Sequence, residues 1–541
     1  MKNVNLLKAE GYHVFATKEY MSRVRGGVNS TTIRISNSPV RALSGKIDVF
    51  IPLDNDSYER YRGMLSKAYV IGDKTKISFD KTINIPFNRI ASEFGNALYA
   101  NTVASGVVCG ILDTEKAKAV SYIEKLFLKK SEEISKKNGE AMASGHEIGE
   151  QLRKDRIVKL DVKKGKDTSA DYLLAGSDAV AIGAVAGGCN AVFAYPMTPS
   201  SSVFTALSGY STSVDIAHEQ VEDEIGAINM ALGCWYAGGR ALVSTSGGGF
   251  ALMTEGISMA GIAETPVVVH LAQRPGPATG LPTRTEQGDL NLVLYAGHGE
   301  FARIILAPGN IEQAFELSAE AFDLADKYQA PVFILTDQYF VDTYYNVPSI
   351  NTAAVKPNYS FLETAEGYKR YALSKEGLSP RGIPGFGKGL VCSDSDEHDE
   401  AGRITEDLEG ISMAMKNKRM KKAATVAKAA MKPVLEGPKN YKNLVICWGS
   451  TYEIVKETLK NPGLKDTAML FFPQLYPVHP SAAALIKKAK KVKVVENNQA
   501  GNFADLLEKE TGIPLKDRVL KYNGLQFSVF ELAAKLKFGG K

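Results

Sequence analysis

The residues best suited to chemistry lie in the middle of the chain. Residues 190–202 read NAVFAYPMTPSSS, in which an apolar run ends in Tyr195-Pro196 and residues 198–201 (TPSS) offer Thr198 as a hydroxyl N-cap with proline at the first helical position. The pattern predicts a buried strand that leads into a helix N-terminus. Because unpaired N–H groups and the positive end of a helix dipole meet there, this turn could hold a carboxylate or a phosphate. A capped turn without a ligand is the simpler interpretation of the local sequence.

A carboxylate follows on the next predicted helix, residues 219–236. On a wheel of about 100° per residue, Glu219, Glu222 and Asp223 point away from an apolar stripe, whereas Glu224 borders it. A carboxylate that is carried toward the interior has its pKa raised by desolvation and can be protonated near neutral pH, which suits hydrogen bonding to a ring nitrogen. A boundary position whose carboxylate reaches water is the plainer alternative. The stripe comprises Val221, Ile225, Ile228, Leu232 and Trp235.

The composition excludes several classes of protein. Lys+Arg 65 against Asp+Glu 60 leaves a formal charge of +5, so the charge balance does not call for nucleic acid. No apolar run approaches the ~18 residues of a membrane span, and the first residues lack the pattern of a signal peptide, so we expect a cytoplasmic protein without a membrane partner. Because the cysteines form no CxxC pair and no Cys/His group at metal-ligand spacing, we expect neither a zinc site nor an iron–sulfur cluster in this chain. They are Cys109, Cys189, Cys234, Cys392 and Cys447.

Strands alternate with helices along most of the chain, which predicts an α/β protein of several domains. A small α/β domain and a charge-rich linker occupy residues 1–165. In residues 166–345 the alternation implies a parallel sheet that is covered on both faces, with ligands beyond the C-terminal ends of its strands. A loop-rich segment, residues 346–440, precedes a second α/β domain in residues 441–541.

Two charged segments have less specific patterns. Residues 19–30, EYMSRVRGGVNS, place Arg23 and Arg25 beside a Gly-Gly pair, which suits an anionic ligand or a subunit contact as well as a solvated loop. Residues 394–400, DSDEHDE, could bind a divalent cation. Their spacing matches no EF-hand pattern, so a solvated loop is the better interpretation.

Three long motifs in register carry a family resemblance: YPMTPSS at 195–201, EDEIGA at 222–227 and QRPGPATGLPT at 273–283. They resemble the α subunit of the 2-oxoacid:ferredoxin oxidoreductases, in the form with an N-terminally fused γ domain. Residues 19–30 resemble that γ domain, and residues 394–400, 449–451 (GST) and 496–498 (ENN) resemble the rest of the α subunit. The resemblance implies a pyrimidine-type thiamine diphosphate domain with a parallel sheet, between a γ-like α/β domain and a transketolase-C-like α/β domain.

The resemblance also implies an activity and roles for single residues. The family uses thiamine diphosphate and [4Fe–4S] clusters to convert a 2-oxoacid and coenzyme A into acyl-CoA and CO2, with two electrons passing to ferredoxin. Glu224 would hydrogen-bond the aminopyrimidine ring, which agrees with its place on the wheel. Thr198 and Arg274 would hold the substrate carboxylate, and Tyr195 with Pro196 would lie on the cofactor side of the same turn.

Two features that the family uses are not in this sequence. There is no GDG motif for a diphosphate–Mg²⁺ site, and cluster cysteines are missing. The resemblance therefore implies a separate β subunit that holds Mg²⁺, the diphosphate and the [4Fe–4S] cluster, in a dimer of αβ heterodimers. Only residues 1–8 precede AEGYHVF, so the first βα unit of the γ domain looks truncated and its contribution to coenzyme A binding stays open.

The substrate is the least specific expectation. The fused γ domain and DSDEHDE look more like members that use 2-oxoglutarate, for which Arg284 could hold the distal carboxylate, although Arg284 could equally pair with Glu286. Pyruvate and branched-chain or aryl 2-oxoacids are the alternatives. A thiamine-dependent decarboxylase subunit that releases aldehyde and a non-catalytic assembly subunit are rival functions.

Overall fold

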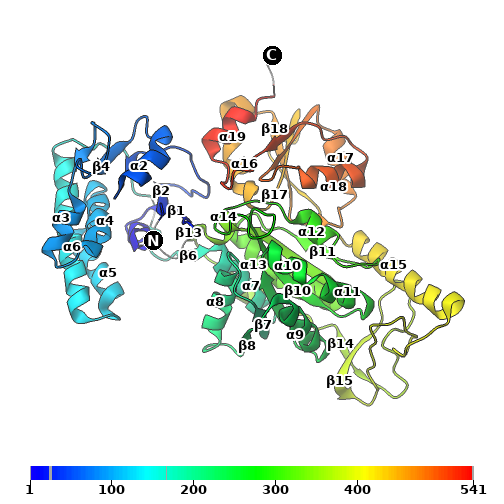
Figure 1. Cartoon of the computed structure of the whole chain (residues 1–541). Coiled ribbons are helices and arrows are strands. Elements are labelled where there is room, and N and C mark those ends of the chain that lie inside the picture. The colour runs from blue at the N-terminus through cyan, green and yellow to red at the C-terminus, as the bar shows by residue number, and fades with distance from the viewer. Residues whose placement is uncertain (1, 23–26, 166, 539–541) are drawn as a thin grey trace. The chain divides into compact units, whose positions relative to one another are not determined.

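The computed structural model describes residues 2–22, 27–165 and 167–538. Arg23 and Arg25, for which an anionic ligand, a subunit contact and a solvated loop were all left open, lie outside the described residues. The chain forms two compact units: Met1–Leu173 with Tyr344–Ser349, and Leu174–Thr343 with Ile350–Lys541 (Figure 1). None of the helices in the described part of the chain is long and apolar enough to cross a membrane.

The smaller unit combines short strands with a group of helices. β1 pairs with both β2 and β13 in antiparallel fashion, and β3, β4 and β5 form a parallel sheet. Its elements are α1 (Lys2–Ala9), β1 (His13–Glu19), β2 (Ser30–Ser36), β3 (Val49–Phe50), α2 (Asn55–Tyr61), η1 (Arg62–Met64), β4 (Tyr69–Gly72), β5 (Ile83–Asn84), α3 (Phe87–Glu93), η2 (Ala97–Tyr99), α4 (Ala100–Ile111), α5 (Lys116–Leu128), α6 (Glu132–Lys154), β6 (Tyr172–Ala175), where the chain passes to the larger unit, and β13 (Tyr344–Val347).

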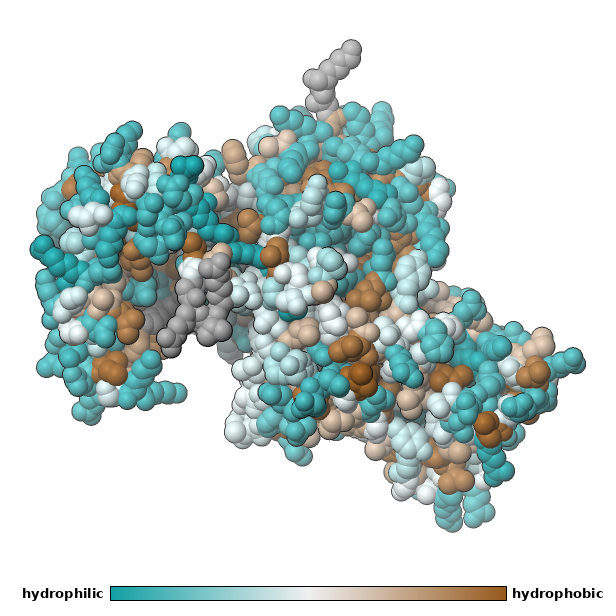
Figure 2. All heavy atoms as spheres, in the orientation of Figure 1, coloured by the Kyte–Doolittle hydropathy of each residue, from teal (hydrophilic) through white to brown (hydrophobic). Residues whose placement is uncertain are grey.

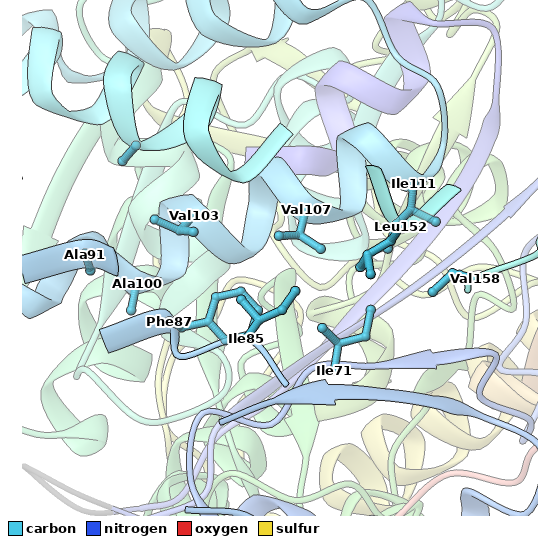
Figure 3. Packing of buried hydrophobic residues seen from close by; sticks show 11 residues of the cluster. Ile71, Ile85, Phe87, Ala91, Ala100, Val103, Val107, Ile111, Leu152 and Val158 are labelled. Carbon is cyan, nitrogen blue, oxygen red and sulfur yellow. The ribbon is translucent and has the colours of Figure 1, made fainter. Parts of the chain in front are cut away.

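The core of the smaller unit depends on apolar side chains and on glycines. Figure 3 shows Ile71, Phe87 and Val107 converging between β4 and the helices, all buried. Helices α4 and α6 meet backbone to backbone, because a Cβ atom at Gly145 would lie 2.1 Å from the carbonyl oxygen of Val103. Glycine is therefore required at this crossing.

The larger unit contains the predicted parallel sheet. Its strand order is β19-β11-β12-β10-β9-β7-β8, and all neighbours are parallel except β19 with β11. Strands β9, β10 and β12 are buried at every residue, because helices cover both faces. The elements of this sheet domain are α7 (Gly176–Ala186), β7 (Ala191–Ala194), α8 (Ser201–Tyr210), β8 (Ala217–Gln220), α9 (Glu224–Tyr236), β9 (Ala241–Thr245), α10 (Gly247–Leu252), α11 (Thr254–Ile262), β10 (Val267–Gln273), α12 (Leu290–Leu294), β11 (Ile304–Leu306), α13 (Ile311–Tyr328), β12 (Pro331–Asp337), α14 (Gln338–Val341) and β19 (Gln474–Tyr476).

A second sheet follows in the C-terminal part of the larger unit. Its order is β16-β18-β17-β20-β21, parallel except for the edge strand β16. The α/β class with parallel sheets that the sequence predicts is thus confirmed. The remaining elements are η3 (Thr352–Ala354), β14 (Phe361–Thr364), β15 (Arg381–Gly387), η4 (Leu408–Ser412), α15 (Met413–Lys428), β16 (Val434–Glu436), β17 (Asn443–Trp448), η5 (Gly449–Thr451), α16 (Tyr452–Thr458), η6 (Pro462–Leu464), β18 (Thr467–Phe472), α17 (Ser481–Lys487), β20 (Lys491–Glu496), α18 (Asn502–Thr511), β21 (Arg518–Leu520) and α19 (Val529–Lys535).

Helix α9 begins later than the sequence pattern predicts. The predicted start at Glu219 is wrong, because residues 217–220 form β8 and the carboxylate of Asp223 caps the helix by accepting a hydrogen bond from the Gly226 N–H at 2.8 Å. Of the predicted apolar stripe, Ile228, Leu232 and Trp235 are buried as predicted, whereas Ile225 is 49% exposed. The buried stripe comprises Glu224, Ala227, Ile228, Ala231, Leu232 and Trp235.

Candidate active site

The turn around Thr198 lies beyond the C-terminal end of β7, as predicted, but it lacks the predicted cap. Helix α8 begins at Ser201, and the Thr198–Pro199 peptide bond is cis. The Ser200 hydroxyl donates backward to the Met197 carbonyl at 2.7 Å, and the Ser201 N–H binds the same oxygen at 3.2 Å. The prediction of Thr198 as N-cap and Pro199 as first helical residue was therefore wrong, because the chain completes a turn before the helix starts.

Arg274 reaches this turn from the end of β10. Its Nη1 atom donates to the Thr198 carbonyl oxygen at 2.5 Å. Its Nε atom is buried and has no hydrogen-bond partner within the residues that the structure describes. Burial lowers the pKa of the guanidinium, and the carboxylates of Asp289 and Glu224 act in the opposite direction. The structure thus brings Thr198 and Arg274 together and leaves a donor for a ligand.

Glu224 is buried at the first position of α9, where its side chain is 2% exposed. Its Oε1 atom lacks a hydrogen-bond partner among the described residues. The carboxyl group lies against Gly249 and the hydroxyl of Thr245, since a Cβ atom at Gly249 would lie 2.1 Å from Glu224 Oε1 and 2.4 Å from Thr245 Oγ1. Burial raises the pKa of Glu224, and the negative charge of Asp223 adds to the rise. The raised pKa favours the protonated form of this carboxyl group, whose unpartnered oxygen is available to a ligand.

A second carboxyl group, Asp289, lies on the other side of the same glycine turn. A Cβ atom at Gly247 would lie 2.5 Å from Asp289 Oδ1. Burial raises the pKa of Asp289 to about 7, with a smaller contribution from Glu286, while Arg274 acts against the rise. The Asp289 Oδ2 atom and the Ser246 hydroxyl are also buried and unpartnered in the described part of the chain. Unpartnered polar atoms thus surround residues 246–249, and buried polar groups without a protein partner point to water or a ligand.

Sequence reasoning missed Asp289. Its neighbours in TEQGDL carry no motif, so the sequence gives no direct reason to choose it. The one available signal was the run of three glycines at 247–249, because glycine allows other groups to approach the backbone closely.

The other predicted site residues lie around this region with different contacts. Tyr195 is 40% exposed and Pro196 is also exposed, so both are open to a ligand or to another chain. Arg284 lies where the loop after β10 meets the C-terminal domain: a Cβ atom at Gly524 would be 3.1 Å from Arg284 Cβ. The Thr285 N–H also donates to the Gly524 carbonyl at 3.1 Å.

Gln287 fixes this loop against the C-terminal domain. Its side-chain amide donates to the Trp448 carbonyl at 2.9 Å and accepts from the Asn497 N–H at 2.8 Å. Its backbone N–H donates to Asn497 and its carbonyl accepts from the Asn498 side chain. Glu496 is buried and accepts hydrogen bonds from the N–H groups of Phe503 and Ala504. The ENN motif therefore positions the loop and helix α18.

The acidic segment 394–400 is more ordered than predicted. Glu397 forms a bidentate pair with Arg419 at 3.0 and 2.7 Å. His398 is fully buried, and its ring centroid lies 3.9 Å from that of Tyr371. Asp399 accepts hydrogen bonds from the N–H groups of Ala401 and Arg403. The segment is a partly exposed loop, as predicted, but Glu397, His398 and Asp399 are held by protein groups.

The arrangement combines two chemical capacities at the C-terminal edge of the sheet. A buried, protonatable carboxyl group with an unpartnered oxygen, Glu224, suits a heterocyclic nitrogen. A guanidinium with an unpartnered N–H, Arg274, suits a carboxylate. Arg274 contacts the turn after β7, and Glu224 contacts the turn after β9. The C-terminal ends of the strands are the usual place for a ligand in an open parallel sheet.

Comparisons with known proteins match this chain to one group of enzymes. Residues 182–417 match the family model "Pyruvate flavodoxin/ferredoxin oxidoreductase, thiamine diP-bdg", and residues 4–148 match "Pyruvate ferredoxin/flavodoxin oxidoreductase". The chain is 30% identical to the 2-oxoacid:ferredoxin oxidoreductase subunit alpha of Sulfolobus sp, over 98% of this chain and 93% of that protein. It is 33% identical to the 2-oxoglutarate synthase subunit KorA of Methanocaldococcus jannaschii, over 59% of this chain and 86% of that protein.

A solved structure extends the similarity to the backbone. The 2-oxoglutarate:ferredoxin oxidoreductase from Magnetococcus marinus, with 2-oxoglutarate, coenzyme A and succinyl-CoA bound, superposes with a TM-score of 0.90 at 28% identity. The match covers 99% of this chain and 95% of that one.

Proposed function

The chain belongs to the family of 2-oxoacid:ferredoxin oxidoreductase α subunits, and from this premise we propose that it forms half of an active site that oxidises 2-oxoglutarate to succinyl-CoA. The observation that carries the proposal is the buried Glu224 carboxyl group, whose unpartnered oxygen lies against Gly249 at the edge of the sheet. The coenzyme A-dependent reaction would release CO2 and pass two electrons to ferredoxin.

The residues present fit the aminopyrimidine end of thiamine diphosphate. Glu224 offers an unpartnered carboxyl oxygen in a dry position, and Gly249 leaves that oxygen room that any side chain would fill. When bound, thiamine diphosphate would supply the nucleophilic chemistry that a 2-oxoacid needs for decarboxylation. Burial raises the pKa of the Glu224 carboxyl group above its ordinary value, which favours the protonated form, and this residue would exchange a proton with the ring nitrogen.

Thr198 and Arg274 would bind the carboxylate next to the 2-oxo group. Arg274 is already oriented by its hydrogen bond to the Thr198 carbonyl, so its side chain would lose little conformational entropy when it binds the substrate. Arg284 would hold the distal carboxylate of 2-oxoglutarate. The placement of Arg284 against Gly524 supports this role, because the C-terminal domain holds its backbone in place.

We infer that a β subunit completes the site. It would carry the GDG motif, Mg²⁺ and the [4Fe–4S] cluster, and would deliver electrons to ferredoxin within a dimer of αβ heterodimers. The site lies beside a surface of α9, α10 and α11 on which Ile225, Leu252 and Met259 are 49%, 50% and 43% exposed, next to the exposed Glu255. Figure 2 shows hydrophobic side chains at the surface of the larger unit. Exposed apolar surface next to a site is typical of a protein interface.

The test compares substrates with the complex of this chain and its co-purified partner. We expect coenzyme A-dependent ferredoxin reduction to be faster with 2-oxoglutarate than with pyruvate or 2-oxoisovalerate, and the isolated chain to be inactive. Faster turnover of pyruvate would overturn the substrate assignment, and activity of the isolated chain would overturn the shared site. Aldehyde release without coenzyme A would indicate a decarboxylase instead.

Arg284→Ala separates substrate selection from catalysis. Because pyruvate lacks a distal carboxylate, the variant should lose kcat/KM for 2-oxoglutarate by about tenfold or more, as expected for a lost charged hydrogen bond, and should keep its rate with pyruvate. An equal loss with both substrates would remove Arg284 from the proposed role.

A further inference from the structure

A chain of buried polar groups runs through the sheet beneath the Thr198 turn. His270 lies on the central strand β10, opposite Ser244 on β9 in the register of the sheet. Its Nδ1 atom is 2.9 Å from the Ser244 hydroxyl, and its Nε2 atom is 2.8 Å from the hydroxyl of Thr336 on β12. Ser244 in turn contacts the carbonyl of Ser200 at 3.2 Å. His270, Ser244 and Ser200 are fully buried, and Thr336 is 3% exposed.

These groups lie on the sheet face opposite to Glu224. Ser244 and Thr245 are neighbours on β9, so their side chains point to opposite faces. Thr245 faces Gly249 and Glu224, whereas Ser244 faces Ser200. The cofactor side and the Thr198 side of the site are therefore supported from different faces of one strand.

The atoms of Ser200, Ser244, His270 and Thr336 allow only one assignment of donors and acceptors among these hydrogen bonds. The Ser200 carbonyl can only accept, so the Ser244 hydroxyl donates to it and must accept from His270 Nδ1–H. Burial lowers the pKa of His270 to about 3, so the ring is neutral and its Nε2 atom accepts from the Thr336 hydroxyl. His270 is thus held as the Nδ1–H tautomer, with both nitrogens satisfied.

We propose that His270 is a positioning residue for 2-oxoacid binding, which acts through Ser244 to fix the turn that carries Thr198. Ser200 is two residues from Thr198, and its hydroxyl and carbonyl are both used within this turn and the relay. Without the hydrogen bond from His270, the Ser244 hydroxyl could rotate away from the Ser200 carbonyl. Thr198 could then move, together with the guanidinium of Arg274 that is bound to it. The proposal rests on the proposed function, since it assigns the turn to the substrate.

The test uses steady-state kinetics of the complex with its β subunit. Ser244→Ala and His270→Leu should raise the KM for the 2-oxoacid about tenfold, the effect of one hydrogen bond, with kcat changed less than twofold and the KM for coenzyme A unchanged. His270→Asn should restore much of the KM, because its side-chain amide can replace Nδ1–H as donor to Ser244. Loss of uniform substrate binding gives this pattern, whereas a merely unstable fold lowers kcat through loss of active enzyme.

A buried histidine outside the site provides the control. His146 in the smaller unit is buried, and its Nε2 atom is 2.8 Å from the Thr114 carbonyl. His146→Leu should leave the KM for the 2-oxoacid unchanged. An unchanged KM in Ser244→Ala and His270→Leu, or equal effects of His270→Leu and His270→Asn, would overturn the inference. A wild-type complex without 2-oxoacid-dependent ferredoxin reduction would instead overturn the proposed function.

Discussion

Two adjacent glycines give a matched test of how Glu224 is placed. A Cβ atom at Gly249 would lie 2.1 Å from Glu224 Oε1, so this oxygen must move by about 0.9 Å to reach the 3.0 Å that real Cβ contacts need. At Gly248, the next residue, the nearest atom to a Cβ is the Ala278 carbonyl oxygen at 3.8 Å, an ordinary contact. Both glycines lie in the first turn of α10, so alanine has the same helical preference at each.

We expect Gly249→Ala to lower kcat strongly and Gly248→Ala to leave it nearly unchanged. A displacement of about 1 Å in a catalytic group can cost about 100-fold in rate, which corresponds to about 2.7 kcal/mol of activation free energy. The assay is coenzyme A-dependent ferredoxin reduction by the co-purified complex at saturating thiamine diphosphate, with circular dichroism to confirm folding. A folded Gly249→Ala complex with a kcat within twofold of Gly248→Ala would refute the placement of Glu224 as the group that acts on the cofactor.

Three further predictions concern stability. Burial raises the pKa of Asp289 to about 7 in the folded chain, from 3.8 in the unfolded chain, so the free energy of unfolding falls as the pH rises from about 4 to 7. Asp289→Asn should therefore raise the Tm relative to wild type more at pH 8 than at pH 5. An equal change in Tm at both pH values would contradict the raised pKa. Gly145→Ala places a Cβ 2.1 Å from the Val103 carbonyl oxygen and should destabilise the α4–α6 pair by about 1–3 kcal/mol. Hydrogen exchange of the amides in these two helices should become faster. Gly63→Ala is the control and should leave that exchange unchanged, because open space surrounds Gly63. Asp326 binds both Arg240 and Arg381 in the interior, so Asp326→Asn should lower the free energy of unfolding by about 3–5 kcal/mol. Asp323, the half-exposed partner of Arg240, is the control. In a denaturant titration, Asp323→Asn should lower the free energy of unfolding less than Asp326→Asn.

The parallel sheet could be predicted because its strands are apolar runs of the right length between helices. The strands at 331–337 and 191–194 are examples, since each is a fully buried run in the structure. Helix starts were less predictable. The acids Glu219, Glu222 and Asp223 look like a first helical turn, but Glu219 lies in the edge strand β8, and only the pairing of β8 with β7 decides this.

The site was predictable to the extent that its residues lie in motifs. Burial of Glu224 followed from the wheel, whereas the pairing of Thr198 with Arg274 was implied by the family resemblance. Asp289 and His270 could not be found in this way. Asp289 lies sixteen residues after Gln273, and the side chain of Gln273 accepts a hydrogen bond from the Asp289 N–H. His270 lies in the fully buried strand β10, where only the packing against β9 and β12 shows its hydroxyl partners.

The most direct test of the account replaces the carboxyl group of Glu224 by the amide of Glu224→Gln in the complex with the β subunit. The amide has the same shape but cannot release or take up a proton as a carboxyl group does, and general acid–base catalysis typically contributes 10²–10⁴-fold. We predict a complex of unchanged size whose coenzyme A-dependent ferredoxin reduction falls by about 100-fold or more. A Glu224→Gln complex that reduces ferredoxin at the wild-type rate would contradict the central claim.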